Sequence, residues 1–260
     1  MTLPVPDPAF RWTAEAWGFA LRCTPLEAIA KHAFTSKQLK LPVGDGWSSA
    51  ATSVGGSPHQ VRRVTQVHGN VVHVLPAGDA SEAAARPEGD AVVSNEAGLV
   101  LAVMVADCVP ILLANRRTGA AGAIHAGWRG TCARVGLTAV DAMRRSFGTD
   151  PSDLVAAIGP SIGPDDYEVG EALIDAFQTA GHSAGDLARW FSRRSARLQL
   201  DLWSANRDQL IDAGVAAARI FTCGLSTFAH TDVFDSFRSA GDRAGRMAAV
   251  ISVPARGPLA

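Results

Sequence analysis

Three apolar segments separated by short polar breaks occupy residues 99–125, and this pattern limits the folds that the chain can adopt. Strands are predicted over residues 99–105, from Val109 or Ile111 to Ala114, and over residues 120–125. The turn at residues 115–119 is too short to hold a crossover helix, so the strands beside it should be antiparallel. This favours an α+β fold over a doubly wound parallel sheet.

Helical and strand patterns alternate irregularly through the rest of the sequence. Helices are predicted over residues 130–147, 171–180 and 202–213, and strands over residues 154–158, 220–223 and 247–253. Residues 41–58 and 76–90 are rich in Gly, Pro, Ser and Ala and are expected to form surface loops. Because 47% of the 260 residues are hydrophobic, we expect a sizeable core, and the length suits one large domain or two small ones.

Charge and cysteine content argue against several classes of function. The 24 basic and 25 acidic residues nearly cancel, so no nucleic acid or membrane is expected as a partner, and no protein partner is predicted. The N-terminus lacks the basic and apolar segments of a signal peptide. The four cysteines are far apart and include no CxxC pair, which is typical of a reduced, cytoplasmic protein rather than of a disulfide framework.

His68, Cys108 and His125 are the candidate metal ligands. Two imidazoles and one thiolate suit zinc, and three protein ligands leave a position for water or substrate. Cys108 follows one predicted strand and His125 ends another, where sites are often built on rigid elements. Taken alone, His68 fits an ordinary surface histidine, and His73, five residues later in an apolar run, is the alternative ligand.

Other residues beside these ligands have more than one interpretation. Asp107 follows an apolar strand, where a carboxylate faces solvent, caps a turn, orients a metal-bound histidine or acts as general acid or base. Arg129 begins a predicted helix, whose free N–H groups favour an anion, although a solvated first-turn residue fits equally well. Ser161 lies in a G-x-S-x-G pattern, but Pro164 interrupts the helix that should follow a nucleophile elbow.

The ordered motifs of the chain resemble those of the laccase-domain family, also called multicopper polyphenol oxidoreductase-like proteins. The motifs include Gln66-Val67-His68-Gly69, Gly89-Asp90-Ala91, Ala106-Asp107-Cys108, His125-Ala126-Gly127-Trp128-Arg129-Gly130, Tyr167-Glu168-Val169-Gly170 and Gly245-Arg246-Met247-Ala248. The resemblance implies a zinc site at His68, Cys108 and His125. It also implies a single α+β domain over residues 1–260, with two mixed β-sheets packed between outer helices, similar to cysteine deamidase toxins.

The activities implied by the resemblance are phosphorolysis of adenosine, inosine and methylthioadenosine, and hydrolytic deamination of adenosine. Nucleoside and phosphate would be the ligands. The implied catalytic residues are Cys108, His125 and Asp107, and the candidates for binding phosphate are Lys37, Arg129 and Arg238. Zinc is expected rather than copper, because seven histidines without an H-x-H pair do not suit the copper centres of a true laccase.

The N-terminal part, residues 1–60, is divergent and shortened relative to the family pattern. Lys37 stands where the family has an arginine, and a lysine lacks the bidentate fork that suits phosphate. Two further functions therefore stay open. One is a cysteine hydrolase or deamidase with Cys108 as nucleophile and His125 as base, and the other is a peptidoglycan-precursor editing factor.

Overall fold

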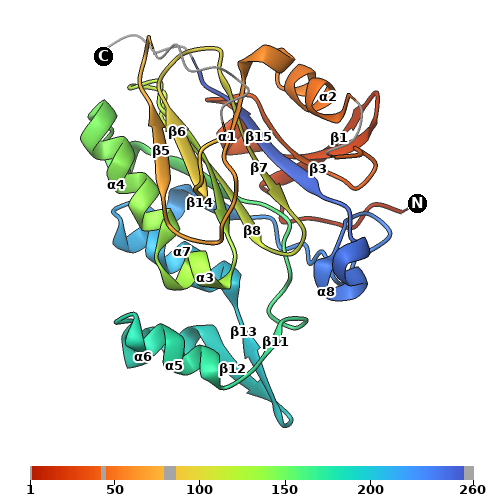
Figure 1. Ribbon diagram of the computed structural model, residues 1–260, viewed down its shortest axis with the longest axis vertical. Helices are drawn as coiled ribbons and strands as arrows, with labels where there is room; N and C mark the ends of the chain where they lie inside the picture. Colours follow the sequence, from red (N-terminus) through yellow and green to blue (C-terminus); the bar gives the residue numbers. More distant parts are fainter. Residues whose placement is uncertain (1, 42–44, 79–85, 255–260) are drawn as a thin grey trace.

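The computed structural model describes residues 2–41, 45–78 and 86–254 of the chain. Two six-stranded sheets lie face to face between outer helices, and a small third sheet extends from one end (Figure 1). The predicted α+β fold with two mixed sheets is therefore confirmed, with the third sheet as an addition. Among the helices that the structure describes, none is long and apolar enough to cross a membrane.

The first sheet has the strand order β1-β2-β3-β15-β7-β4. Its strands are β1 (Phe10–Glu15), β2 (Gly18–Cys23), β3 (His32–Thr35), β15 (Met247–Ser252), β7 (Val100–Val105) and β4 (Val61–Arg63). Neighbouring strands are antiparallel except β4 and β7, which are parallel. The expectation of a loop over residues 41–58 is wrong in part, because α2 (Gly46–Ser53) covers this sheet with the buried Ala50 and Ala51.

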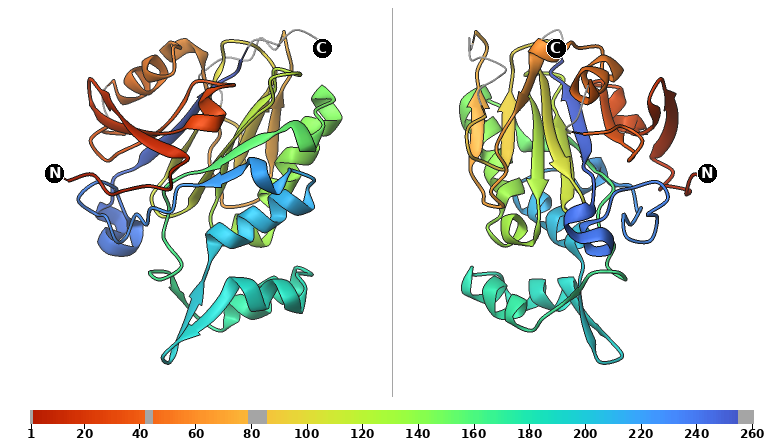
Figure 2. Two further views of the ribbon diagram at one scale, coloured as in Figure 1. Left: turned by 180° about the vertical axis from the view of Figure 1, so that it is seen from behind. Right: turned by 45° about the vertical axis from the view of Figure 1, so that its right-hand side comes forward.

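The second sheet has the strand order β14-β10-β8-β9-β6-β5. Its strands are β14 (Ile220–Thr222), β10 (Val155–Ile158), β8 (Val109–Ala114), β9 (Ala121–Ala126), β6 (Ala91–Ser94) and β5 (Val72–Leu75). β8 and β9 form the predicted antiparallel pair, with Pro110 opposite His125. The helices α4 (Val135–Phe147) and α7 (Leu202–Asp212) cover the outer face of this sheet (Figure 2).

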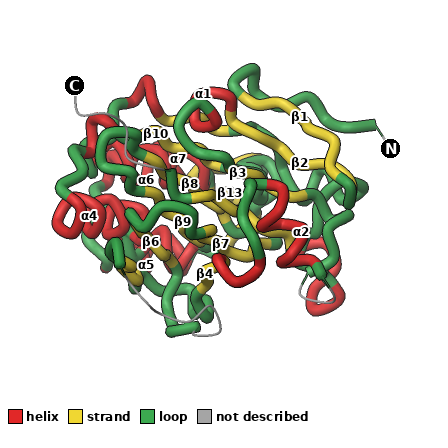
Figure 3. Tube along the Cα trace, turned by 90° about the horizontal axis from the view of Figure 1, so that it is seen from above, coloured by secondary structure: helices red, strands yellow, loops and turns green. Residues whose placement is uncertain are grey.

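Both faces of the central strands are buried, which explains their unbroken apolar sequences. Alternate residues of a strand point to opposite faces. In β7, Leu101 thus belongs to the core between the two sheets, whereas Val100 belongs to the cluster beneath α2. In β8, Leu112 faces the other sheet and Ile111 faces the cluster that includes α4. The layers are therefore helix, sheet, sheet and helix, as the view along them shows (Figure 3).

The helix predicted over residues 130–147 is two helices, α3 (Trp128–Cys132) and α4. Arg134 between them has a left-handed backbone with φ of 58°, which a right-handed helix cannot include. Its guanidinium donates to the Ala180 carbonyl oxygen, 2.8 Å away. The apolar spacing continues across this break, so periodicity alone does not reveal it.

The third sheet contains β11 (Glu168–Val169), β13 (Arg197–Leu200) and β12 (Phe191–Arg194). The helices α5 (Ala172–Thr179) and α6 (Ala184–Trp190) lie beside it at the lower end of the molecule (Figure 1). The short strand β11 follows Tyr167, so this unit is connected directly to one wall of the site described below.

Candidate metal centre

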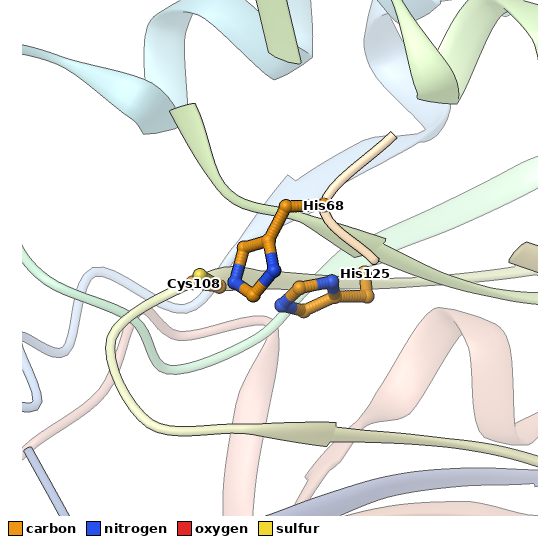
Figure 4. Close-up of side chains that lie close together, drawn as sticks. All are labelled: His68, Cys108 and His125. Atoms are coloured by element: carbon orange, nitrogen blue, oxygen red, sulfur yellow. The ribbon is translucent and has the colours of Figure 1, made fainter. Parts of the chain in front are cut away.

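His68, Cys108 and His125 converge where the chain passes between the two large sheets (Figure 4). Their candidate ligand atoms all lie within 4.8 Å of one another, and the two imidazole centroids are 4.9 Å apart. His125 is the second-last residue of β9, and Cys108 directly precedes β8. His68 lies in the connection from β4 to β5. The structure thus brings together the three residues that the sequence singled out.

The alternatives to these residues lie elsewhere. The Nε2 atom of His73, in β5, lies 2.7 Å from the Glu88 carbonyl oxygen, and His73 does not belong to the cluster. Ser161 is fully buried, and its hydroxyl accepts a 2.6 Å hydrogen bond from the Trp203 indole. The helix that a nucleophile elbow requires does not follow Ser161, since the next helix, α5, begins only at Ala172.

The loop that carries His68 is held at two points. The Gln66 side chain pairs with the Met104 backbone through two 2.8 Å hydrogen bonds. The Asp90 carboxylate accepts from the backbone N–H groups of residues 67, 68 and 69 at 3.3, 2.9 and 2.6 Å. His68 has a positive φ of 62°, a backbone conformation that is uncommon for a non-glycine residue. These bonds keep the strained backbone in place at the site.

Asp90 also orients His125. Its Oδ1 lies 2.8 Å from Nδ1 of His125, and the Asp90 side chain is fully buried. Burial by itself raises the pKa of Asp90, but the hydrogen bonds from His125 and from the loop lower it below its usual range. With Nδ1 bonded to a carboxylate, Nε2 is left for a metal. The sequence does not by itself assign this role to Asp90, although a carboxylate directly before an apolar strand is a signal that could have indicated it.

Of the roles that the sequence left open for Asp107, the structure does not show the orientation of an imidazole. The Asp107 carboxylate accepts from the Thr227 hydroxyl at 2.5 Å, the Ser236 hydroxyl at 3.1 Å and the Arg238 backbone N–H at 2.6 Å. These bonds fix the start of α8 (Phe237–Ala240), and the orienting role belongs to Asp90. Asp107 has a φ of 83° and lines a cavity beside Cys108, so a contact with substrate stays open to it.

The two histidines favour a thiolate at Cys108. Burial by itself raises the pKa of this thiol, but the hydrogen bonds and charges of His125 and His68 lower it to about 6. Burial likewise lowers the pKa of His125, but Asp90 and Cys108 raise it to about 9. In contrast, burial raises the pKa of both Cys23 and Cys223 to about 12. Cys108 is therefore the thiol suited to metal binding or nucleophilic chemistry.

Gly127 is required by the close approach of two of these side chains. A Cβ atom at this position would lie 2.8 Å from Sγ of Cys108 and 3.2 Å from Cδ2 of His68. The first distance is shorter than real Cβ contacts allow, so a side chain here would displace the cluster. This accounts for the small residues directly after His125.

Two cavities meet at the cluster, and both are lined by His68, Ala106, Cys108 and Phe237. The larger one, of about 480 Å³, also has Arg63, Arg86 and Arg246 in its wall, and we call it the arginine cavity. The smaller one, of about 270 Å³, has Trp128 and Tyr167 in its wall, and we call it the aromatic cavity.

The three predicted phosphate-binding residues are placed differently. Arg129 and Arg238 line the aromatic cavity, where their guanidinium groups lie 4.2 Å from the Trp128 ring and 5.1 Å from the Tyr167 ring. Lys37 lines neither cavity, and its ammonium group donates to the Thr231 carbonyl oxygen. The structure thus places two of the three residues at the site.

The chain matches a family model described as multi-copper polyphenol oxidoreductase laccase over residues 33–254. The chain belongs to this family.

Relatives in this laccase-like family carry the names of nucleoside enzymes. A purine nucleoside phosphorylase of Deinococcus radiodurans is 39% identical over 217 residues, which cover 83% of this chain and 79% of the relative. A purine nucleoside phosphorylase of Bacteroides thetaiotaomicron is 39% identical over 63% of this chain and 60% of the relative. Adenosine deaminase RL5 of an unknown prokaryotic organism is 39% identical over 65% of this chain and 64% of the relative. The matches to the last two span less than two thirds of each relative.

Solved structures of similar proteins have the same fold. YlmD from Geobacillus stearothermophilus is 29% identical, with a TM-score of 0.79 over 94% of this chain and 98% of that one. The hypothetical protein YfiH of Bacillus licheniformis is 24% identical, with a TM-score of 0.84 over 95% of this chain and 100% of that one. Each likeness covers at least 94% of this chain.

Proposed function

We propose that the protein is a zinc-dependent purine nucleoside enzyme. It would phosphorolyse adenosine, inosine and methylthioadenosine and would deaminate adenosine, with nucleoside and phosphate as its ligands. The observation that carries this proposal is the His-Cys-His cluster at the base of a cavity with aromatic walls. The names of two relatives, a purine nucleoside phosphorylase and an adenosine deaminase, support this choice of substrate. We place the enzyme in the cytoplasm, because a free thiolate such as Cys108 is kept reduced there.

The donor set fits one zinc ion. Two imidazole nitrogens and one thiolate are typical zinc ligands, and a fourth position would stay open. In the described ranges of the chain this is the one cluster of three or more candidate ligands, so the residues suit a single metal rather than the several copper ions of a laccase. When bound, zinc would supply Lewis acidity and lower the pKa of a water molecule toward neutrality.

The residues around the cluster would bind and orient the nucleoside. Trp128 and Phe237 offer apolar faces on which a purine ring can stack. Burial and the nearby Cys108 charge raise the pKa of Tyr167 to about 12, so its phenol stays protonated and can donate to the base. Asp107 would exchange a proton with the purine from the wall beside Cys108.

Metal analysis combined with a nucleoside panel tests this proposal. We expect about one zinc per chain, phosphate-dependent release of base from inosine, and phosphate-independent conversion of adenosine to inosine. Both reactions should be lost in the Cys108→Ala variant and after chelation, with circular dichroism unchanged. The matched control is Cys132→Ala, which removes a half-buried thiol outside both cavities and should keep both activities. Unchanged turnover by metal-free protein would overturn the proposal.

The low pKa of Cys108 beside His125 favours a second candidate, a cysteine hydrolase. In that case the metal-free protein would be the active form, and iodoacetamide would inactivate it. In the zinc enzyme, bound metal would protect Cys108 from alkylation. Comparing the alkylation of metal-loaded and metal-free protein with their activities separates the two candidates.

A further inference from the structure

The arginine cavity has a different chemical character from the aromatic cavity. Arg63, Arg86 and Arg246 contribute three positive charges, and no aspartate or glutamate is among its described lining residues. None of the three arginines forms an ion pair within the ranges that the structure describes. The aromatic cavity, by comparison, combines the Asp107 carboxylate with the two guanidinium groups of Arg129 and Arg238. An uncompensated cluster of guanidinium groups in a concave wall attracts anions.

Two of these arginines, Arg63 and Arg246, are held in place by contacts that do not neutralise their charge. The guanidinium carbon of Arg63 lies 4.0 Å from the Trp47 ring centroid, so stacking fixes this side chain. Arg246 donates to the carbonyl oxygens of Ala244 and Gly245 at 2.9 and 2.8 Å through Nη1 alone. Its Nη2 and Nε have no acceptor among the residues described, which leaves donors for a ligand.

Burial and, to a lesser extent, the neighbouring Arg86 both act on the pKa of Arg63. Partial burial lowers the pKa of Arg63 to about 10, and the positive charge of Arg86 contributes to the lowering. A bound anion would offset both effects. Guanidinium groups bind the oxygens of phosphate through paired, charge-assisted hydrogen bonds.

We propose that the arginine cavity binds a phosphate group through Arg63, Arg86 and Arg246, next to the His-Cys-His cluster. This inference rests on the proposed function and assigns the phosphate to residues other than Arg129 and Arg238. In phosphorolysis, an oxygen of hydrogen phosphate would form a bond to C1′ of the ribose as the C1′–N9 bond breaks. The bonding electron pair goes to N9, which takes the proton of the hydrogen phosphate, and the products are ribose 1-phosphate and the free base.

The phosphate group can come from inorganic phosphate or from a nucleotide, and a binding experiment distinguishes the two sources. Isothermal titration calorimetry on the zinc-loaded protein would use inorganic phosphate, AMP and adenosine as probes. Because each charge-assisted contact contributes about 1.5 kcal/mol or more, Arg63→Gln and Arg246→Gln should each weaken phosphate binding about tenfold or more. Adenosine binding should change less than about twofold. If the two substitutions weaken the binding of AMP but not of inorganic phosphate, the phosphate group that binds in this cavity is that of a nucleotide.

Arg62→Gln is the matched control. Arg62 is the neighbour of Arg63 in β4, does not line the arginine cavity, and loses the same charge on substitution. Unchanged phosphate and AMP binding in both Arg63→Gln and Arg246→Gln, or an equal loss in Arg62→Gln, would overturn the assignment. The binding measurement needs no turnover. Arginine-dependent phosphate binding without turnover of any nucleoside would therefore support the subsite and count against the proposed function.

Discussion

One buried carboxylate, Asp90, sets both the backbone and the side-chain geometry of the candidate metal centre. It holds the His68 loop through backbone N–H groups and His125 through Nδ1. In Asp90→Asn one acceptor oxygen becomes an NH₂ group that faces N–H donors, so we expect zinc affinity to fall about 10- to 100-fold. Competition with a chromogenic chelator measures this change.

Asp150→Asn is the control for this substitution. Asp150 also accepts from a backbone N–H, that of Ser152, but it lies in a connection far from the cluster. The Asp150→Asn substitution should leave zinc affinity unchanged. Equal zinc affinities for Asp90→Asn and the unaltered protein would show that the carboxylate does not support the ligands.

At the scale of elements, the strands that are buried on both faces could be predicted from the sequence. Their unbroken runs of apolar residues are not typical of a surface loop. The predicted strands at residues 99–105 and 120–125 differ from β7 and β9 by one residue at their ends. The sequence did not show that β7 and β8 belong to different sheets, because a short connection fits either a hairpin or a crossing. Nor did it show the arginine cavity, whose arginines come from three separate segments.

The first residue of β3, His32, makes the stability of this element sensitive to pH. It is fully buried, its Nε2 accepts from the Cys23 N–H at 2.8 Å, and its Nδ1 donates to the Ala30 carbonyl oxygen at 3.0 Å. Burial lowers the pKa of His32 to about 4, and the Arg22 charge acts in the same direction. The unfolded chain has a pKa of about 6.5 for histidine, so protonation favours unfolding.

The contribution of His32 to stability is thus fully present above about pH 6.5 and is lost as the pH falls to about 4. We expect the unaltered protein to lose on the order of 3 kcal/mol more than His32→Gln over this range. Urea unfolding at a series of pH values measures the difference. His59→Gln, at an exposed histidine, should follow the unaltered protein. Parallel pH profiles for the unaltered protein and His32→Gln would contradict the assignment.

At the scale of the whole molecule, the metal centre lies on the route between the two large sheets. The connection from β4 to β5 carries His68 and the connection from β7 to β8 carries Cys108, and each leads from the first sheet to the second. His125 belongs to the second sheet itself. A bound metal would therefore link the two connections that carry His68 and Cys108 to the second sheet, which carries His125. Three buried apolar clusters hold the layers together without any ligand residue, so we expect the metal-free protein to stay folded.

Zinc should therefore raise the melting temperature of a protein that is already folded. A ligand at a hundredfold excess over its dissociation constant adds about 2.7 kcal/mol of stability, which corresponds to roughly 5–10 °C for a chain of this size. Differential scanning calorimetry with chelator and then with zinc measures the shift. Cys108→Ala removes a ligand and should abolish it, whereas Cys132→Ala, outside both cavities, should keep it. If Cys108→Ala showed the same rise in melting temperature, the stabilising zinc would bind elsewhere. If the metal-free protein were unfolded, folding itself would require the ion, contrary to this prediction.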